Sequence, residues 1–289
     1  MIAYGAVVWW PRTKLSTTSN KLQRIQRLAC MAITGCMRTT PTAALEAMLG
    51  LPPLHLFIQQ EAAVAAIRLK PLNLWSKSST QHTSLLEELA SEFPLIRAIN
   101  DWIPKQFISD KKYKIQLYED HRCEGLCPAE LRIFTDGSKT GTGTGAGIFS
   151  EDLSVHIATP LGAHNTVFQA ECLGISLAAS AIMARKVEDH SIRILSDSMA
   201  VLQALSSHTV NSGLVQECHQ TLNQVGKPNN ITIQWIKGHS GSRGNDAAYE
   251  LARRGSSMDA VGPEPIVPLP FGYLRTLVRK RTRDQHNES

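Results

Sequence analysis

The chain contains little cysteine, and its few cysteines are widely spaced. Six occur among 289 residues, which is too few and too scattered for the disulfide framework of a small secreted domain. Cys123 and Cys127 lie close together, but no second Cys or His pair follows them at zinc-ligand spacing. We therefore expect six free thiols in a reducing compartment.

Long hydrophobic runs are also scarce. The apolar run over residues 2–10 is far shorter than the roughly 20 residues that a membrane-spanning helix needs. The sequence does not open with a secretory signal. We expect an intracellular protein, nuclear or cytoplasmic, with no membrane partner.

Charged residues make up only 19% of the chain and hydrophobic residues 43%, which is typical of a globular protein of one or two domains and excludes disorder. The formal net charge is +5, and the excess lies at the two ends. Residues 1–70 carry 8 Lys and Arg against 2 Asp and Glu, residues 271–289 carry 5 against 2, and residues 129–256 carry 10 against 11. Basic flanks around a neutral domain suit a polyanionic partner, although solvated surfaces would explain them as well.

Hydrophobic patterning divides the chain into four segments. Residues 1–70 are predicted to be a small helical region, and residues 71–128 a linker with one or two short helices, because their periodicity is weak. Residues 129–256 alternate strand and helix patterns. Residues 257–289 form a tail that opens Pro-rich and ends basic.

Helical spacing is clearest over residues 21–36, where Gly35 is a plausible stop. The spacing predicts one buried face, made of Leu22, Ile25, Leu28, Ala29, Ala32 and Ile33. Arg24 and Arg27 lie among these positions and could contact a phosphate backbone.

The third segment has the order β-β-β-α-β-α-α-β-α, which predicts a mixed five-stranded α/β sheet flanked by helices. Its early strands are joined as hairpins, and its later strands are reached through helical crossovers. The expected strands cover residues 131–136, 146–149, 154–158, 192–197 and 231–236.

Three carboxylates stand at positions where a solvated side chain is not expected. Asp136 and Asp197 each end an apolar strand, and Glu171 lies on the apolar stripe of a predicted helix. If the two strands are parallel and adjacent, their carboxylates emerge side by side at one edge of the sheet. Three converging carboxylates repel one another unless a hard divalent cation, Mg²⁺ or Mn²⁺, lies between them. Taken singly, each has an ordinary explanation as a turn, a helix cap or a surface residue.

Four motifs in order resemble type 1 ribonuclease H over about 125 residues. They are most similar to the ribonuclease H domain of non-LTR retrotransposon reverse transcriptases. The motifs are Thr135-Asp136-Gly137-Ser138, Gln169-Ala170-Glu171, Ser196-Asp197-Ser198 and Trp235-Ile236-Lys237-Gly238-His239-Ser240-Gly241.

The resemblance implies a ribonuclease H-like fold and a metal-dependent endonuclease that hydrolyses the RNA strand of RNA–DNA hybrids. Two ions would be held by Asp136, Glu171 and Asp197, with Asp136 shared between them. His239 would assist proton transfer or product release, and Ser138 would contact the substrate. The implied partner is the hybrid, the protein is expected to be a monomer, and no small-molecule cofactor is expected.

The segment after these four motifs, in the predicted last helix, departs from the family pattern. The family has a metal-binding Asp within a sequence similar to Gly-Asn-Glu-x-Ala-Asp, and an ungapped alignment puts Tyr249 at that position and Asp246 at the motif's Glu. A neutral phenol is a poor Mg²⁺ ligand. Asp246, one turn earlier on the same helix face, is a weak substitute, and Glu250 points elsewhere. The alternative reading is therefore a catalytically decayed remnant that binds nucleic acid without cutting.

The region upstream of these motifs resembles the connection that follows the polymerase in the same elements, through residues 35–45 and 50–54. No counterpart of the polymerase palm is present, so we expect no DNA synthesis. A truncated copy of a mobile element accounts for both departures.

Other functional classes fit less well. An integrase or exonuclease on the same fold is disfavoured by residues 235–241, with His239 on a loop before the last helix. A purely structural module would leave Asp136, Glu171 and Asp197 unexplained.

Overall fold

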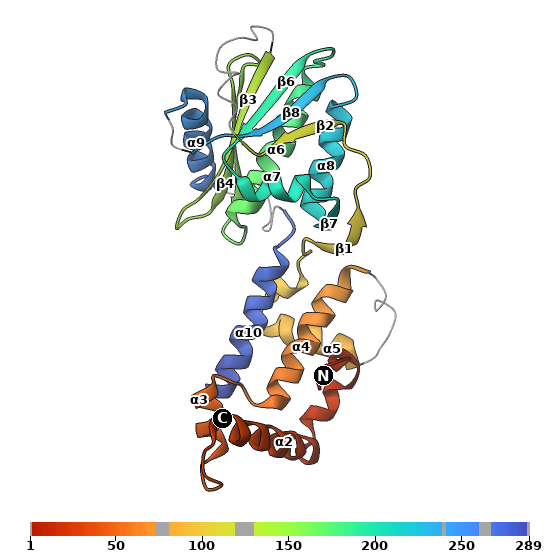
Figure 1. Ribbon diagram of the computed structural model, residues 1–289, viewed down its shortest axis with the longest axis vertical. Coiled ribbons are helices and arrows are strands. Elements are labelled where there is room, and N and C mark those ends of the chain that lie inside the picture. The colour runs from red at the N-terminus through yellow and green to blue at the C-terminus, as the bar shows by residue number, and fades with distance from the viewer. Residues whose placement is uncertain (1, 73–80, 119–129, 239–240, 260–266, 288–289) are drawn as a thin grey trace. The chain divides into compact units, whose positions relative to one another are not determined.

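The protein folds into two compact units, and the chain passes from the first to the second and back again. The helical unit comprises Met1–Ile99 and Phe271–Ser289, and the sheet unit comprises Asn100–Pro270 (Figure 1). The computed structural model describes residues 2–72, 81–118, 130–238, 241–259 and 267–287.

The helical unit is built around α4, which contacts α1, α2, α5 and α10. Its largest fully buried side chains include Trp10, Leu45, Ile58, Ile67 and Leu89. The elements are α1 (Ala6–Trp9), η1 (Trp10–Lys14), α2 (Ser16–Thr34), α3 (Thr42–Leu49), α4 (Leu54–Leu69), η2 (Lys70–Leu72), α5 (Gln81–Glu92), η3 (Pro94–Arg97) and α10 (Phe271–Asn287), where η denotes a 3₁₀ helix.

The turn between α2 and α3 is held by local hydrogen bonds. Gly35 ends α2 in the left-handed conformation, with φ 67°, as the sequence predicted. The Arg27 guanidinium donates to the carbonyl oxygens of Thr40 and Arg38 and to Oγ1 of Thr42. Arg27 therefore stabilises this turn, and these three hydrogen bonds engage three of the five N–H donors of its guanidinium.

The predicted burial of α2 is wrong. The buried residues are Leu22, Gln26 and Cys30, whereas most of the predicted apolar stripe is exposed, with Leu28 at 65% and Ile33 at 68%. The Gln26 side chain donates to the Pro52 carbonyl and accepts from the Leu54 amide. These long-range hydrogen bonds let a polar residue occupy the buried face, which periodicity alone does not reveal.

The unit boundaries also differ from the predicted segments. Within the predicted linker, residues 71–128, α5 packs in the helical unit, and the strands β1 (Trp102–Phe107) and β2 (Tyr113–Gln116) belong to the sheet unit. The predicted basic tail contains a folded helix, α10, which packs against α4. Each of these elements is short or charged, so its local sequence pattern is weak. Its packing depends on partners far away in the sequence.

The main sheet has six strands in the order β2-β8-β6-β3-β4-β5, where five were predicted. The sixth is β2, which pairs in parallel with β8, so that Tyr113 lies opposite Ile231. The pairs β3–β6 and β6–β8 are also parallel, and β3–β4 and β4–β5 are antiparallel. The mixed sheet flanked by helices is as predicted. The remaining bounds are β3 (Glu130–Lys139), β4 (Thr144–Ser150), β5 (Val155–Gly162), β6 (Ser191–Ser196), β7 (Thr209–Ser212) and β8 (Asn230–Trp235).

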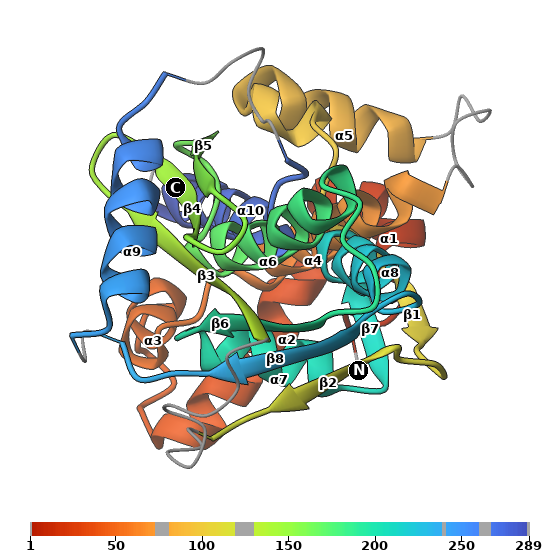
Figure 2. The same cartoon turned by 90° about the horizontal axis from the view of Figure 1, so that it is seen from above.

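Helices cover both faces of this sheet. The helices α6 (Val167–Ala184), α7 (Met199–Ser206) and α8 (Gly213–Val225) lie on one side, and α9 (Arg243–Ser256) lies on the other (Figures 1 and 2). Among the described helices, α6 has the length and hydropathy of a membrane span, and 61% of this helix is buried inside the protein. This burial marks α6 as the core helix of the sheet unit. A separate two-stranded ribbon joins β1 to β7.

Candidate metal centre

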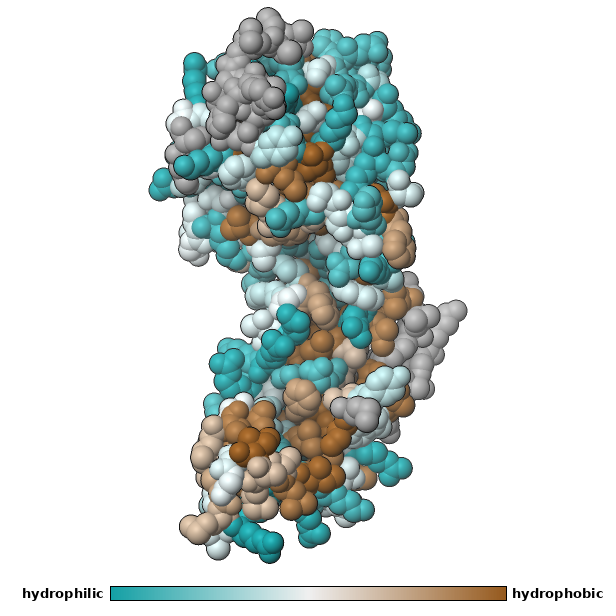
Figure 3. All heavy atoms as spheres, in the orientation of Figure 1, coloured by the Kyte–Doolittle hydropathy of each residue, from teal (hydrophilic) through white to brown (hydrophobic). Residues whose placement is uncertain are grey.

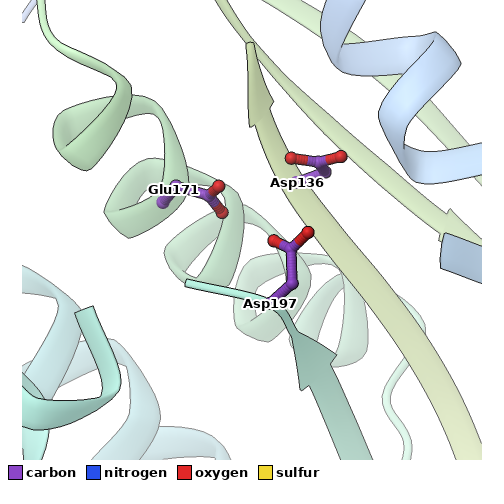
Figure 4. Close-up of side chains that lie close together, drawn as sticks. All are labelled: Asp136, Glu171 and Asp197. Carbon is purple, nitrogen blue, oxygen red and sulfur yellow. The ribbon is translucent and has the colours of Figure 1, made fainter. Parts of the chain in front are cut away.

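Three carboxylates from three different elements meet in the sheet unit. Oxygen atoms of Asp136, Glu171 and Asp197 all lie within 4.8 Å of one another. Figure 4 shows the three side chains directed toward one another from β3, α6 and the end of β6 (Figure 4). The convergence predicted from the sequence is confirmed.

The strand pairing brings two of these residues together. β3 and β6 are parallel neighbours, and their last pair is Thr135 opposite Ser196. Asp136 directly follows Thr135 and Asp197 directly follows Ser196, so the two carboxylates emerge side by side. The sequence analysis placed Asp136 at the end of its strand, but β3 continues to Lys139 by pairing with β4. The Asp-Gly dipeptide is therefore not a turn here, because antiparallel pairing with β4 extends the strand through it.

Glu171 is positioned by the first turn of α6. A reciprocal capping box starts this helix, in which the Thr166 side chain accepts from the Gln169 amide and the Gln169 side chain accepts from the Thr166 amide. Gly137 then leaves room for the carboxylate, because a Cβ at that position would lie 2.8 Å from Glu171 Cγ. The Thr-x-x-Gln spacing is a readable sequence signal for this helix start, and sequence reasoning did not use it.

The segment after β8 borders the third carboxylate. Trp235 Nε1 donates to the backbone oxygen of Asp197 at 3.0 Å. A Cβ on Gly238 would lie 2.6 Å from Asp197 Oδ2, so a larger residue at this position would force the Asp197 carboxylate to shift. Both residues belong to a motif named in the sequence analysis, but their positioning role follows only from the three-dimensional contacts.

Burial and mutual repulsion raise the pKa of the carboxylates. Asp136 is 4% exposed and Glu171 is 5% exposed. Burial, and then the charge of Asp197, raises the pKa of Asp136 to about 7. A hydrogen bond from the Gly137 backbone lowers this pKa and offsets part of the increase. Burial, followed by the charges of Asp136 and Asp197, raises the pKa of Glu171 well above its usual value. Without a cation, the cluster therefore holds protons near neutral pH.

The donor set fits a divalent metal ion. Within the described part of the chain, Glu171 Oε2 is buried and has no hydrogen-bond partner, which is costly for a carboxylate oxygen. A cation ligated there would satisfy this oxygen and remove the repulsion that raises the pKa values. Carboxylate oxygens are the ligands that Mg²⁺ and Mn²⁺ prefer.

The predicted weak ligand Asp246 is not part of this cluster. Among the described residues, the converging group comprises three carboxylates, and Asp246 lies outside it, exposed in the first turn of α9. Tyr249 is half-buried on the same helix, and Ser138 is half-buried on β3 opposite Gly145. His239 lies outside the described residues.

Comparison with known proteins agrees with this geometry. Residues 128–257 match the family model for RNase H. The strand topology and the acidic cluster define an α/β domain with a candidate metal centre, and this domain is similar to the RNase H family. This family acts on RNA in RNA–DNA hybrids and typically uses a divalent metal.

The chain is also similar to individual proteins. It is 27% identical over 168 residues to ribonuclease H of Schizosaccharomyces pombe, and this match covers 54% of this chain and 64% of that protein. The chain thus spans less than two thirds of the length of this relative. Two solved structures resemble it, each with a TM-score of 0.34 over 44% of this chain. One is the N-terminal RNase H domain of a Mycobacterium tuberculosis protein fused to maltose-binding protein, 20% identical with 99% of that chain covered, and the other is RNase H1 from Halobacterium salinarum, 19% identical with 96% covered.

Proposed function

We propose that residues 129–256 are a metal-dependent endonuclease that hydrolyses the RNA strand of RNA–DNA hybrids. The observation that carries this proposal is the cluster of Asp136, Glu171 and Asp197, in which one buried carboxylate oxygen has no partner among the described residues. The match to the RNase H family supports the substrate class.

The three carboxylates are the proposed ligands of two divalent ions, Mg²⁺ or Mn²⁺. When bound, such ions activate a water for attack on the scissile phosphate and stabilise the leaving oxygen. His239, by resemblance to the family, is proposed to move a proton or aid product release. Ser138, on β3 two residues beyond Asp136, is proposed to contact the substrate.

Tyr249 supports a second candidate function, a domain that binds hybrids without cleaving them. It stands where the family motif has a metal-binding Asp, and the nearby Asp246 is exposed and apart from the cluster. A phenol supplies no anionic ligand at neutral pH. We therefore propose that metal binding is weakened on one side of the site and that cleavage is reduced or absent.

A cleavage assay with three proteins separates the two candidates. A labelled RNA–DNA hybrid is incubated with Mg²⁺ or Mn²⁺ and the wild type, Asp136→Asn or Tyr249→Asp. Wild-type cleavage at internal sites that is lost in Asp136→Asn supports an active nuclease. A silent wild type that becomes active in Tyr249→Asp supports the decayed site. No cleavage by any protein rejects the nuclease proposal.

The origin and location of the protein are further proposals. The resemblance of residues 35–45 and 50–54 to the post-polymerase connection supports an origin in a non-LTR retrotransposon. We propose a monomer in the nucleus or cytoplasm, which fits the nucleic-acid substrate. Sedimentation and cell fractionation test these two points.

A further inference from the structure

The exposed side of α10 carries four basic residues that the fold of the helical unit does not use. These residues, here called the basic ridge, are Arg275, Arg279, Lys280 and Arg283, and all are exposed. Three of them follow one another at intervals of four residues, so they share one face of the helix, with a rise of about 6 Å between successive positions.

The opposite side of α10 explains why the ridge is held in place. Leu274, Val278 and Thr282 are buried, and α10 packs against α4. The fifth basic residue of α10, Arg281, forms ion pairs within the helical unit: its guanidinium lies 2.8 Å from Glu88 and 2.8 Å from Glu92. The helix is therefore fixed by its apolar face and by these ion pairs, and the ridge faces outward.

Within the part of the chain that the structure describes, no ridge residue has an ion-pair partner. Like charges at four-residue spacing destabilise a helix, and a polyanion with regularly spaced charges relieves this repulsion. A lipid surface fits less well, because a membrane-binding helix needs a free apolar face. Leu274 and Val278 are buried inside the unit, and the described residues of α10 include no exposed large hydrophobic side chain.

We propose that the basic ridge binds the phosphate backbone of the RNA–DNA hybrid and so adds a second, sequence-independent contact outside the nuclease domain. The identity of this partner rests on the proposed function. Phosphate contacts by Lys and Arg release counterions, so their number is measured by the salt dependence of binding.

The test compares two triple variants of the full chain. Arg275→Gln/Arg279→Gln/Arg283→Gln removes three ridge charges. The matched control removes three exposed lysines of the sheet unit, Lys114→Gln/Lys186→Gln/Lys227→Gln. Binding of a fluorescent RNA–DNA hybrid is measured in EDTA, which prevents cleavage, as salt is raised from 50 to 200 mM. Circular dichroism checks that all proteins are folded.

Loss of three phosphate contacts makes the slope of log K against log salt shallower by about 2.7, since each contact contributes about 0.9. Over this fourfold salt range, the wild type should lose roughly 40 times more affinity than the ridge variant, and the control should behave as the wild type. A ridge variant with the wild-type slope overturns the proposal, as does a control whose slope falls equally. Loss of binding to anionic phosphatidylserine vesicles with an unchanged hybrid slope also overturns it, in favour of a lipid surface.

Failure of the proposed function leaves a different result. If no protein cleaves RNA with Mg²⁺ or Mn²⁺ but the ridge variant still has a shallower slope, the nuclease proposal fails and the ridge proposal holds. If cleavage occurs and the slope does not change, the reverse is true.

Discussion

Replacement of Gly147 by Ala tests how closely α9 must approach the sheet. Gly147 lies on β4 directly opposite Asp136. A Cβ there would lie 2.1 Å from the Ala248 carbonyl oxygen and 2.3 Å from the Ala252 amide nitrogen. Both atoms belong to the backbone of α9, so no side-chain rotation can relieve the clash.

The size of the effect follows from these distances. Ordinary contact begins at 3.4 Å, so the 2.1 Å approach must open by about 1.3 Å. Overpacking of this kind typically destabilises a protein by about 1–3 kcal/mol. For a domain of roughly this size each kcal/mol lowers Tm by about 2–4 °C, so we expect Gly147→Ala to lower Tm by roughly 2–12 °C.

The assay is thermal unfolding followed by circular dichroism, with Gly141→Ala as the control. Among the described residues, no atom lies within 4 Å of the position that a Cβ on Gly141 would take, so its replacement should leave Tm nearly unchanged. Because α9 carries Tyr249 and β4 pairs with the strand that carries Asp136, hybrid cleavage should also fall in Gly147→Ala. Equal Tm values for the two variants would refute the close packing of α9 on β4.

Three other predictions concern the site and the core. Asp136→Asn should raise Tm in EDTA, because it removes a buried charge that repels Asp197, and it should abolish any rise in Tm on adding Mg²⁺. A variant that Mg²⁺ still stabilises would contradict the ligand assignment. Burial, and then the charge of Lys111, lowers the pKa of His219 from 6.5 to about 4. The unfolded protein therefore binds this proton more readily than the folded protein, so the stability contributed by neutral His219 is complete above pH 6.5 and is lost as pH falls toward 4. Urea unfolding at pH 7 and pH 4.5 should show an acid-induced loss of up to about 3 kcal/mol that is smaller in His219→Gln, and an equal loss in both proteins would rule out this residue. Trp235→Phe should lose about 1 kcal/mol with the hydrogen bond to Asp197, as urea unfolding at pH 7 would measure, and an unchanged stability would show that this bond contributes nothing.

The three carboxylates were predictable because each carries a local sequence signal. Asp136 follows an alternating strand pattern, Asp197 follows a short apolar run, and Glu171 interrupts the apolar stripe of a helix. Parallel strands deliver their carboxyl ends to one edge of a sheet, so the order of elements was enough to bring these residues together. The parallel pairing of β3 with β6 confirmed that step.

Positions whose role depends on a distant partner were not predictable. Tyr113 pairs with Ile231 on β8, and a strand as short as β2 has no local sequence pattern that predicts this pairing. Likewise, Gly238 lies beside the Asp197 carboxylate, and this proximity exists only after folding.

The sequence by itself determined five of the strands and the main helices of the sheet unit, and which carboxylates the fold gathers, because periodicity and the order of elements are local properties. Only the tertiary structure decided which faces are buried. It left the apolar stripe of α2 exposed and turned a basic tail into the packed helix α10. It also ran β3 through Asp136 as far as Lys139. The physical reason is that burial is a property of pairs of elements, and the partner of each of these segments lies far away along the chain.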